Sequence, residues 1–357
     1  MTTPAQVPDR PPRSNRSNRP DTPSRRRVSP AAQPSGAALP DTFQPEAIPS
    51  KKKGRYGTQN LVVLALQVAG WAALLTAIGH TIDRAPALAA LSVFAFCMLM
   101  QGVFSMMHEY FHDNAHPDQR VNYGIGLVGA TLFGTSATLH RVNHWGHHVR
   151  NRTPAEQGEF IHEGESPLGK TALYYFAVTV GLWLSGFVFP FLALLIPYRA
   201  ITWLSASERY NTYSAAFAQF KARDWTRMRL EALGLAAFWT LVGAFGPWSL
   251  TTLLLAYVAF AFSWSSLQWV YHLRTPLHVV EGAYNLRLPT PLRWLWLSFN
   301  MNLTHHRRPY LPWQELYAAS DPRETQPLWY RWLLMFKPPM RFPEDPAALS
   351  MFDKRYF

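Results

Sequence analysis

Cysteine is almost absent from this chain of 357 residues. The single thiol, Cys97, lies within an apolar run, so the chain can form neither an internal disulfide nor a four-cysteine iron–sulfur cluster. No haem-binding or flavin domain is recognisable. An apolar segment near the start is also lacking, and we therefore expect no secretory signal peptide. Any metal chemistry would depend on ligands other than thiolates.

Acidic residues are scarce relative to basic ones, with 22 Asp and Glu against 34 Lys and Arg and a net charge of +12. In a soluble protein this charge would suggest nucleic acid. Here the basic residues gather in the N-terminal part and between apolar segments, as in the cytoplasmic loops of membrane proteins, so we expect no nucleic-acid partner. Residues 1–57 are rich in Pro, Ser and Arg and predict a disordered cytoplasmic tail.

Long apolar runs are present, and they decide the fold class. Residues 59–82 and 86–107 are each long enough to cross the hydrocarbon core, and together they predict a hairpin that returns to its starting side. The stretch 123–139 is shorter and rich in Gly and Thr, so we expect it to be interfacial. Two further apolar stretches cover residues 171–198 and 230–271.

These runs predict an all-α polytopic membrane protein with four to six transmembrane helices and a cytoplasmic helical cap. Four spans result if each of the last two stretches crosses once, and six result if each is a hairpin. The basic segment 199–229 lies inside only in the second case, and we favour six segments, some of them crossing incompletely. Residues 58–320 then form the membrane domain, and 321–357 form a cytoplasmic C-terminal tail.

Histidine is concentrated where the second apolar run ends, because seven of the 13 histidines lie within residues 107–148. Two clusters stand there and a third lies far downstream, with one isolated member before it: His108 and His112; His144, His147 and His148; His272; His305 and His306. Residues three or four apart on a helix share a face, so each cluster can point at a common centre. Eight imidazoles are too many for one tetrahedral zinc ion and suit two metal ions.

An alternative interpretation concerns the first cluster alone. His108-Glu109-x-x-His112 is also the helical zinc-protease motif, in which the glutamate is the general base. A membrane protease would need none of the other histidine clusters, so this motif explains only a part of the pattern.

The three clusters together resemble the histidine boxes of the integral-membrane fatty acid desaturase and hydroxylase superfamily, and bacterial lipid desaturases in particular. The similarity covers about residues 60–320 and includes, beyond the boxes, Asn122, Gly126, Arg141, Gly282, Ala283, Asn285, Leu286, Asn300, Pro309, Pro312 and Trp313. It implies as metal ligands His108, His112, His144, His147, His148, His272, His305 and His306. His116 follows His112 at the same spacing, but the 36 residues between His108 and His144 are typical of the family and favour the earlier pair.

One position departs from the family pattern. The first residue of the third box is usually His, sometimes Gln, and here it is Asn302, whose carbonyl oxygen binds iron more weakly than imidazole. Gln268, at the end of the last apolar run, is a candidate for a water-mediated contact. Asp113, Glu109 and Glu156 either orient imidazole N–H groups or are solvated carboxylates on a basic surface.

The resemblance implies two Fe2+ ions as cofactors, O2 as co-substrate, and a lipid or acyl substrate that enters an apolar channel from the bilayer. Loss of hydrogen from two adjacent carbons gives a desaturase, whereas return of a hydroxyl gives a hydroxylase or ketolase of a lipid, carotenoid or alkane; both remain open. We expect a separate electron donor of the ferredoxin, rubredoxin or cytochrome type. We also expect a bacterial inner-membrane location, with both termini and the site on the cytoplasmic side.

Overall fold

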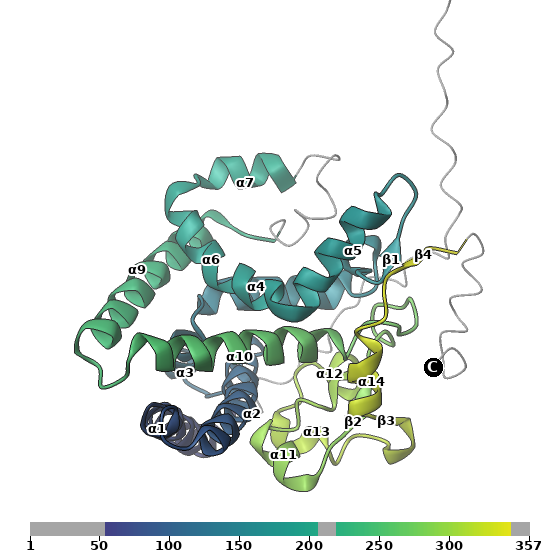
Figure 1. Ribbon diagram of the computed structural model, residues 1–357. Coiled ribbons are helices and arrows are strands. Elements are labelled where there is room, and N and C mark those ends of the chain that lie inside the picture. The colour runs from purple at the N-terminus through teal and green to yellow at the C-terminus, as the bar shows by residue number, and fades with distance from the viewer. Residues whose placement is uncertain (1–53, 206–218, 344–357) are drawn as a thin grey trace, which may run out of the picture. The chain divides into compact units, whose positions relative to one another are not determined.

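In the computed structural model, residues 54–205 and 219–343 are described, and most of them are helical (Figure 1). Nearly all of the tail expected at residues 1–57 lies outside the described residues. The helices are α1 (Gly57–Thr81), α2 (Pro86–Phe111), α3 (Gln119–Phe133), α4 (Ala137–Arg150), α5 (Pro167–Phe176), α6 (Leu182–Leu195), α7 (Tyr198–Ser205), α9 (Ala222–Phe245), α10 (Leu250–Trp269), α11 (Thr290–Leu295), α12 (Asn302–Arg307), α13 (Trp313–Leu316) and α14 (Leu328–Leu334). Short parallel strands pair β1 (Phe160–Ile161) with β4 (Met340–Arg341), and β2 (Asn285–Arg287) with β3 (Thr325–Pro327).

Five helical stretches in the described part of the chain are long and apolar enough to cross a membrane: Gly57–Thr81, Pro86–Phe111, Pro167–Leu195, Ala222–Phe245 and Leu250–Trp269. The predicted all-α membrane fold with four to six candidate spans is thereby confirmed. α3 is not among these stretches. Its 15 residues are too few to cross the hydrocarbon core, which agrees with the interfacial or partly buried segment expected there.

The hairpin that we favoured within residues 171–198 is wrong. α5, a π-helical turn at Ala177–Gly181 and α6 form one helical stretch of 29 residues. Gly186 and Pro190 lie inside α6 without ending it, because neighbouring groups in an apolar helix bundle satisfy the backbone that proline leaves free. The stretch 230–271 does turn, at Gly246 and Pro247, and this turn separates α9 from α10.

The short connection between α3 and α4 determines where the helix with the second histidine cluster begins. Asp118 caps α3, and its carboxylate accepts hydrogen bonds from two backbone N–H groups of the first turn. α3 ends at Gly134, whose φ of 88° is favourable only for glycine. Ser136 then caps α4 by accepting the backbone N–H of Leu139, so only three residues separate the two helices.

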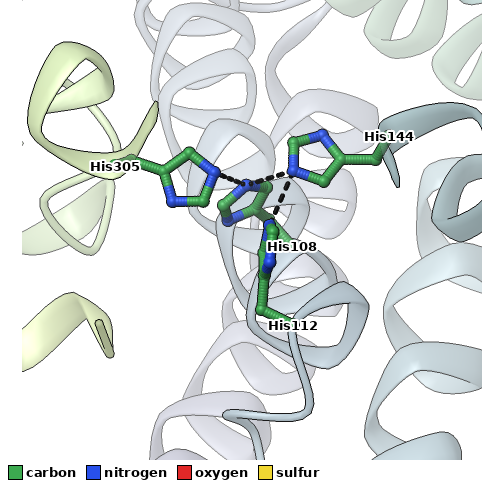
Figure 2. Close-up of side chains that lie close together, drawn as sticks. All are labelled: His108, His112, His144 and His305. Atoms are coloured by element: carbon green, nitrogen blue, oxygen red, sulfur yellow. Dashed lines mark hydrogen bonds between the residues drawn. The ribbon is translucent and has the colours of Figure 1, made fainter. Parts of the chain in front are cut away.

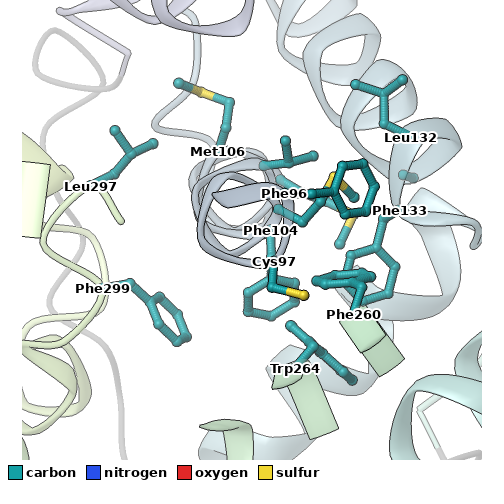
Figure 3. Packing of buried hydrophobic residues seen from close by; sticks show 14 of the residues in the cluster. Phe96, Cys97, Phe104, Met106, Leu132, Phe133, Phe260, Trp264, Leu297 and Phe299 are labelled. Atoms are coloured by element: carbon teal, nitrogen blue, oxygen red, sulfur yellow. The ribbon is translucent and has the colours of Figure 1, made fainter. Parts of the chain in front are cut away.

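An aromatic core lies against the histidine-bearing end of α2 (Figure 3). The ring of Phe104 contacts those of Phe133, Trp264 and Phe299 at centroid distances of 5.8, 5.1 and 5.4 Å. Phe299 in turn lies 5.0 Å from the ring of His108. Aromatic pairs at these separations add to the stability that their burial provides. The first histidine cluster therefore packs against a layer of buried aromatic side chains.

Candidate metal centre

A first group of imidazoles comes from three distant parts of the chain and meets at the end of α2 (Figure 2). Nε2 of His108 lies 3.0 Å from Nε2 of His144 and 3.1 Å from Nε2 of His305. Nε2 of His112 lies 2.7 Å from Nε2 of His144. His148 joins from the next turn of α4, with its Nε2 3.0 Å from those of His144 and His305.

Hydrogen bonding alone does not explain this arrangement. Nε2 of His144 has three other Nε2 atoms within 3.0 Å, whereas a ring nitrogen carries either one proton or one lone pair. Nitrogens that bind one metal ion at about 2.1 Å and at right angles to each other lie about 3.0 Å apart. The convergence of imidazole nitrogens at this separation fits a shared transition-metal ion.

A second group consists of His147, His272 and His306, whose ligand atoms lie within 4.8 Å of one another. Nδ1 of His147 lies 2.6 Å from Oε2 of Glu156, and Nδ1 of His272 lies 3.1 Å from the carbonyl oxygen of Gly282. Because a carboxylate and a carbonyl only accept, both rings donate through Nδ1–H and keep the Nε2 lone pair. Nε2 of His306 is buried and has no hydrogen-bond partner among the described residues. This donor set suits a second metal ion.

The two groups are neighbours. The ring of His148 lies 4.9 Å from that of His305 in the first group and 4.6 Å from that of His306 in the second. The structure thus brings together all eight histidines that the sequence indicated as ligands.

Burial prepares these imidazoles for metal binding. The pKa values of six of them lie well below the ordinary value, chiefly because burial disfavours the charged form: His112, His144, His148, His272, His305 and His306. At pH 7 these rings are neutral, which is the form that binds a metal ion.

The other predicted site residues lie at varied places. Asn302 begins α12, and its buried Oδ1 has no hydrogen-bond partner among the described residues, as is also true of Nε2 of Gln268 on α10. Asp113 forms an ion pair with Arg141, with 2.9 Å between the carboxylate oxygen and Nη1. His116 lies outside both groups, and its Nδ1 accepts a hydrogen bond from the backbone N–H of Asp118.

The zinc-protease interpretation finds no support in the position of its glutamate. The carboxylate of Glu109 is buried and accepts a hydrogen bond from the backbone N–H of Trp313 at 3.3 Å. It therefore anchors the segment that follows the third histidine cluster. His305, which a protease does not require, lies beside His108.

Two buried carboxylates that the sequence did not indicate hold the histidine segments in place. Glu159 pairs with Arg152 through 2.6 and 3.2 Å contacts and accepts the backbone N–H of Arg274 at 2.8 Å. It therefore joins the loop after α4 to the loop after His272. Glu231 on α9 accepts hydrogen bonds from the hydroxyl groups of Tyr123, Ser136 and Thr138 and from the backbone N–H of Thr138.

No signal within the sequence marked these pairs, since the partners of Glu231 lie 93 to 108 residues away. Arg152 and Arg274 both have positive φ, at 61° and 58°. Such conformations are costly for residues other than glycine and persist where surrounding contacts impose them. The two loops are therefore held in a defined shape beside the second histidine group.

Comparison with known protein families places this geometry in context. The sequence pattern of the family described as fatty acid desaturase matches residues 84–337, which include α2 to α14 and all eight clustered histidines. Comparison with individual curated proteins gave no match. Because the family pattern covers well over half of the chain and contains both histidine groups, this integral-membrane protein belongs to the fatty acid desaturase family.

Proposed function

We propose that the chain is a membrane di-iron oxidoreductase that uses O2 and external electrons to desaturate the acyl chain of a fatty acid or lipid. The observation that carries the proposal is the meeting of two adjacent imidazole groups, one of four residues and one of three, drawn from separate segments. His108, His112, His144 and His305 would hold one iron and His147, His272 and His306 the other, with His148 between them.

Bound iron would supply what no side chain offers, the activation of O2 for removal of hydrogen from an unactivated C–H bond. The overall reaction balances as one CH2–CH2 unit, O2, two electrons and two protons giving one CH=CH unit and two waters. The chain has one cysteine and cannot form a four-cysteine iron–sulfur cluster, so the electrons would come from a separate donor of the ferredoxin, rubredoxin or cytochrome type.

The protein orients the imidazole ligands and excludes water from part of the site. Glu156 and the Gly282 carbonyl fix the tautomers of His147 and His272. Phe104 and Phe299 pack beneath His108 and exclude water from one side of the first group. An acyl chain is apolar, and these aromatic side chains provide an apolar surface beside the metal ligands against which it can bind.

We propose that the histidine face is cytoplasmic and that the membrane is a bacterial inner membrane. The basic segments of the sequence lie before α1 and between α6 and α9, and an excess of Lys and Arg favours the cytoplasmic side. Residues 58–320 would form the membrane domain. The proposed tail from residue 321 contains β3, α14 and β4, and both strands pair with earlier strands.

Metal analysis and lipid analysis test the function together. We expect two irons per chain in the purified protein and new double bonds in the lipids of a host that expresses it. His305→Ala with His306→Ala should abolish both, whereas His80→Ala, at the exposed far end of α1, should change neither. One zinc per chain, or full activity of the double variant, would refute the proposal. Oxygenated lipids, pigments or alkanols in place of double bonds would select the hydroxylase or ketolase alternative.

A further inference from the structure

A groove of about 670 Å³ is lined by side chains of α3 and α9. α3 contributes Tyr123, Leu127 and Thr131 to its lining. α9 contributes Arg223 and Arg227, then Leu230 and Glu231, and further along Gly234 and Phe238. This volume lies within the range of pockets that bind small molecules, and the metal centre uses none of these side chains as a ligand.

The two ends of the groove differ in chemistry. Arg227 lies over the ring of Tyr123, with 5.3 Å from its guanidinium carbon to the ring centroid, and Tyr123 lies 6.1 Å from Tyr110 near the histidine-bearing end of α2. Phe238 lies 6.4 Å from Trp71, halfway along α1. The groove therefore begins with arginines at the level of the histidines and continues with apolar side chains toward the middle of the helix bundle.

The length of the groove matches one leaflet of a bilayer. Arg223 and Phe238 are 15 residues apart on one helix, which corresponds to about 22 Å. The hydrocarbon of one leaflet is about 15 Å deep, so the arginines reach the headgroup level when Phe238 lies in the hydrocarbon. Leu230 and Leu127 on the walls are 65% and 37% exposed, as expected for side chains that face lipid.

The charge at the polar end is positive. The side chain of Arg223 is 79% exposed and forms an ion pair with its neighbour Asp224, with 3.6 Å between Nε and the carboxylate oxygen. An exposed pair of this length contributes little, so the guanidinium stays available to a second anion. Glu231 also lines the groove, but it is buried and its two carboxylate oxygens accept four hydrogen bonds from Tyr123, Ser136 and Thr138. Its charge is therefore directed away from a ligand, and the accessible groups at this end attract an anion.

We propose that this groove binds an anionic phospholipid of the surrounding bilayer. The phosphate lies at Arg223 and Arg227, and one acyl chain follows the wall of Leu230, Gly234 and Phe238. The bound lipid is a constituent of the membrane and not the substrate. Through Glu231 the lipid-facing helix α9 is joined to α4, so the lipid also supports the helix that carries the second histidine cluster.

Two pairs of variants test the site in the full-length protein purified in detergent. The double variant Arg223→Gln and Arg227→Gln removes the phosphate contacts, and Arg120→Gln, exposed on the first turn of α3 outside the groove, is its control. Gly234→Leu fills the apolar part. A Cβ atom at Gly234 would meet no atom within 4 Å, and the same is true of Gly243 on the same helix, so Gly243→Leu is a matched control. Both leucines favour helix formation over glycine, and neither threatens the fold.

Native mass spectrometry with added phosphatidylglycerol or phosphatidylcholine gives the readout. We expect one phosphatidylglycerol per chain, bound about 30-fold more weakly by the double arginine variant, since each arginine near a lipid surface contributes about fivefold to the affinity. Gly234→Leu should also weaken binding, and both controls should retain it.

The proposal would be overturned by equal binding of both phospholipids, or by unchanged binding in the double arginine variant and in Gly234→Leu. Displacement of phosphatidylglycerol by a free fatty acid would also overturn it and would assign the groove to the substrate. Protein stripped of metal should bind phosphatidylglycerol as well as the intact protein does. The lipid site and the proposed oxidase activity therefore succeed or fail separately.

Discussion

At the scale of single residues, three carboxylates near the first two histidine clusters have different surroundings. Glu156 accepts a hydrogen bond from Nδ1–H of His147, Glu109 accepts the backbone N–H of Trp313, and Asp113 pairs with Arg141. The sequence places all three near the clusters and leaves open for each whether it orients an imidazole or is a solvated carboxylate. The folded contacts show that Glu156 lies within hydrogen-bond distance of an imidazole, that of His147.

Replacement of Glu156 by Gln should weaken metal binding at the second group. The amide keeps the size of the side chain but removes the charge that stabilises the Nδ1–H tautomer of His147, and loss of such a partner lowers metal affinity by about 10- to 100-fold. Iron titration of the purified variant measures this, with Glu163→Gln, an exposed carboxylate outside both groups, as the control. Two irons held at the affinity of the unchanged protein would contradict the prediction.

Acid should destabilise the metal-free protein. The pKa values of His112, His144, His148 and His305 lie well below the ordinary value, mainly because of burial. The unfolded chain therefore binds more protons below a pH of about 6.5, and each such histidine removes up to about 1.4 kcal/mol of stability per pH unit. Thermal unfolding of the metal-free protein should occur at lower temperature at pH 5.5 than at pH 7.5. A midpoint that stays constant or rises on acidification would show that these rings are not buried in the neutral form.

Single residues also mark the limit of prediction from sequence. The eight histidines were recognisable because ligand spacing on a helix is a local property that three separate segments repeat. Glu159 and Glu231 were not recognisable, since a carboxylate in an apolar or loop segment carries no local sign of its partners. Both acquire their role from residues that are distant in sequence and that only tertiary packing brings close.

At the scale of elements, the stretch formed by α5 and α6 differs from the other candidate spans. The end of α6 packs against α4, since Ala193 and Phe189 share a cluster with Leu139 and Val142. α5 lies near the C-terminal segment, since the hydroxyl of Tyr174 in its last turn donates to the backbone carbonyl of Met335. The stretch therefore contacts the C-terminal segment through α5 and the helix of the second histidine cluster through α6. We infer that this stretch does not change sides, and that α1, α2, α9 and α10 make four crossings.

Cysteine labelling distinguishes four crossings from five. The natural Cys97 is buried, so Glu163→Cys before α5, Arg199→Cys after α6 and Asp83→Cys between α1 and α2 each add one exposed thiol. In intact cells a membrane-impermeant reagent should label only the thiol at position 83, and the other two should react after permeabilisation. Opposite behaviour of positions 163 and 199 would establish a fifth crossing.

The number of spans could not be predicted from the sequence because it depends on whether residues 167–195 cross the membrane. Hydropathy reports whether a stretch prefers lipid and says nothing about the direction in which it runs. Residues 167–195 contain an 18-residue window about as apolar as the corresponding windows of α1 and α2. The packing of α6 against α4 depends on the fold of the whole helix bundle. The turn at Gly246 and Pro247, in contrast, was visible because those residues interrupt a helix locally.

At the scale of the whole molecule, the proposed activity needs electrons that the chain does not generate by itself. The net charge of +12 and the basic segments expected on the cytoplasmic side suit an acidic donor protein. Arg308 is an exposed basic residue that directly follows the third histidine cluster and its neighbour Arg307, whose guanidinium already pairs with Glu281 and Glu324. We therefore expect a donor to dock over the end of α12.

Turnover with a protein donor should fall as salt rises. Screening shortens the reach of charge from about 10 Å at 0.1 M salt to about 3 Å at 1 M, so docking that depends on the net charge weakens while chemistry at the buried histidines does not. Arg308→Glu should lower the donor-dependent rate about threefold or more at low salt, and Arg84→Glu, at the α1–α2 turn, should leave it unchanged. With a small chemical reductant in place of the donor, both variants should match the unaltered enzyme. A salt-independent rate with the protein donor would place docking on a surface other than this basic face.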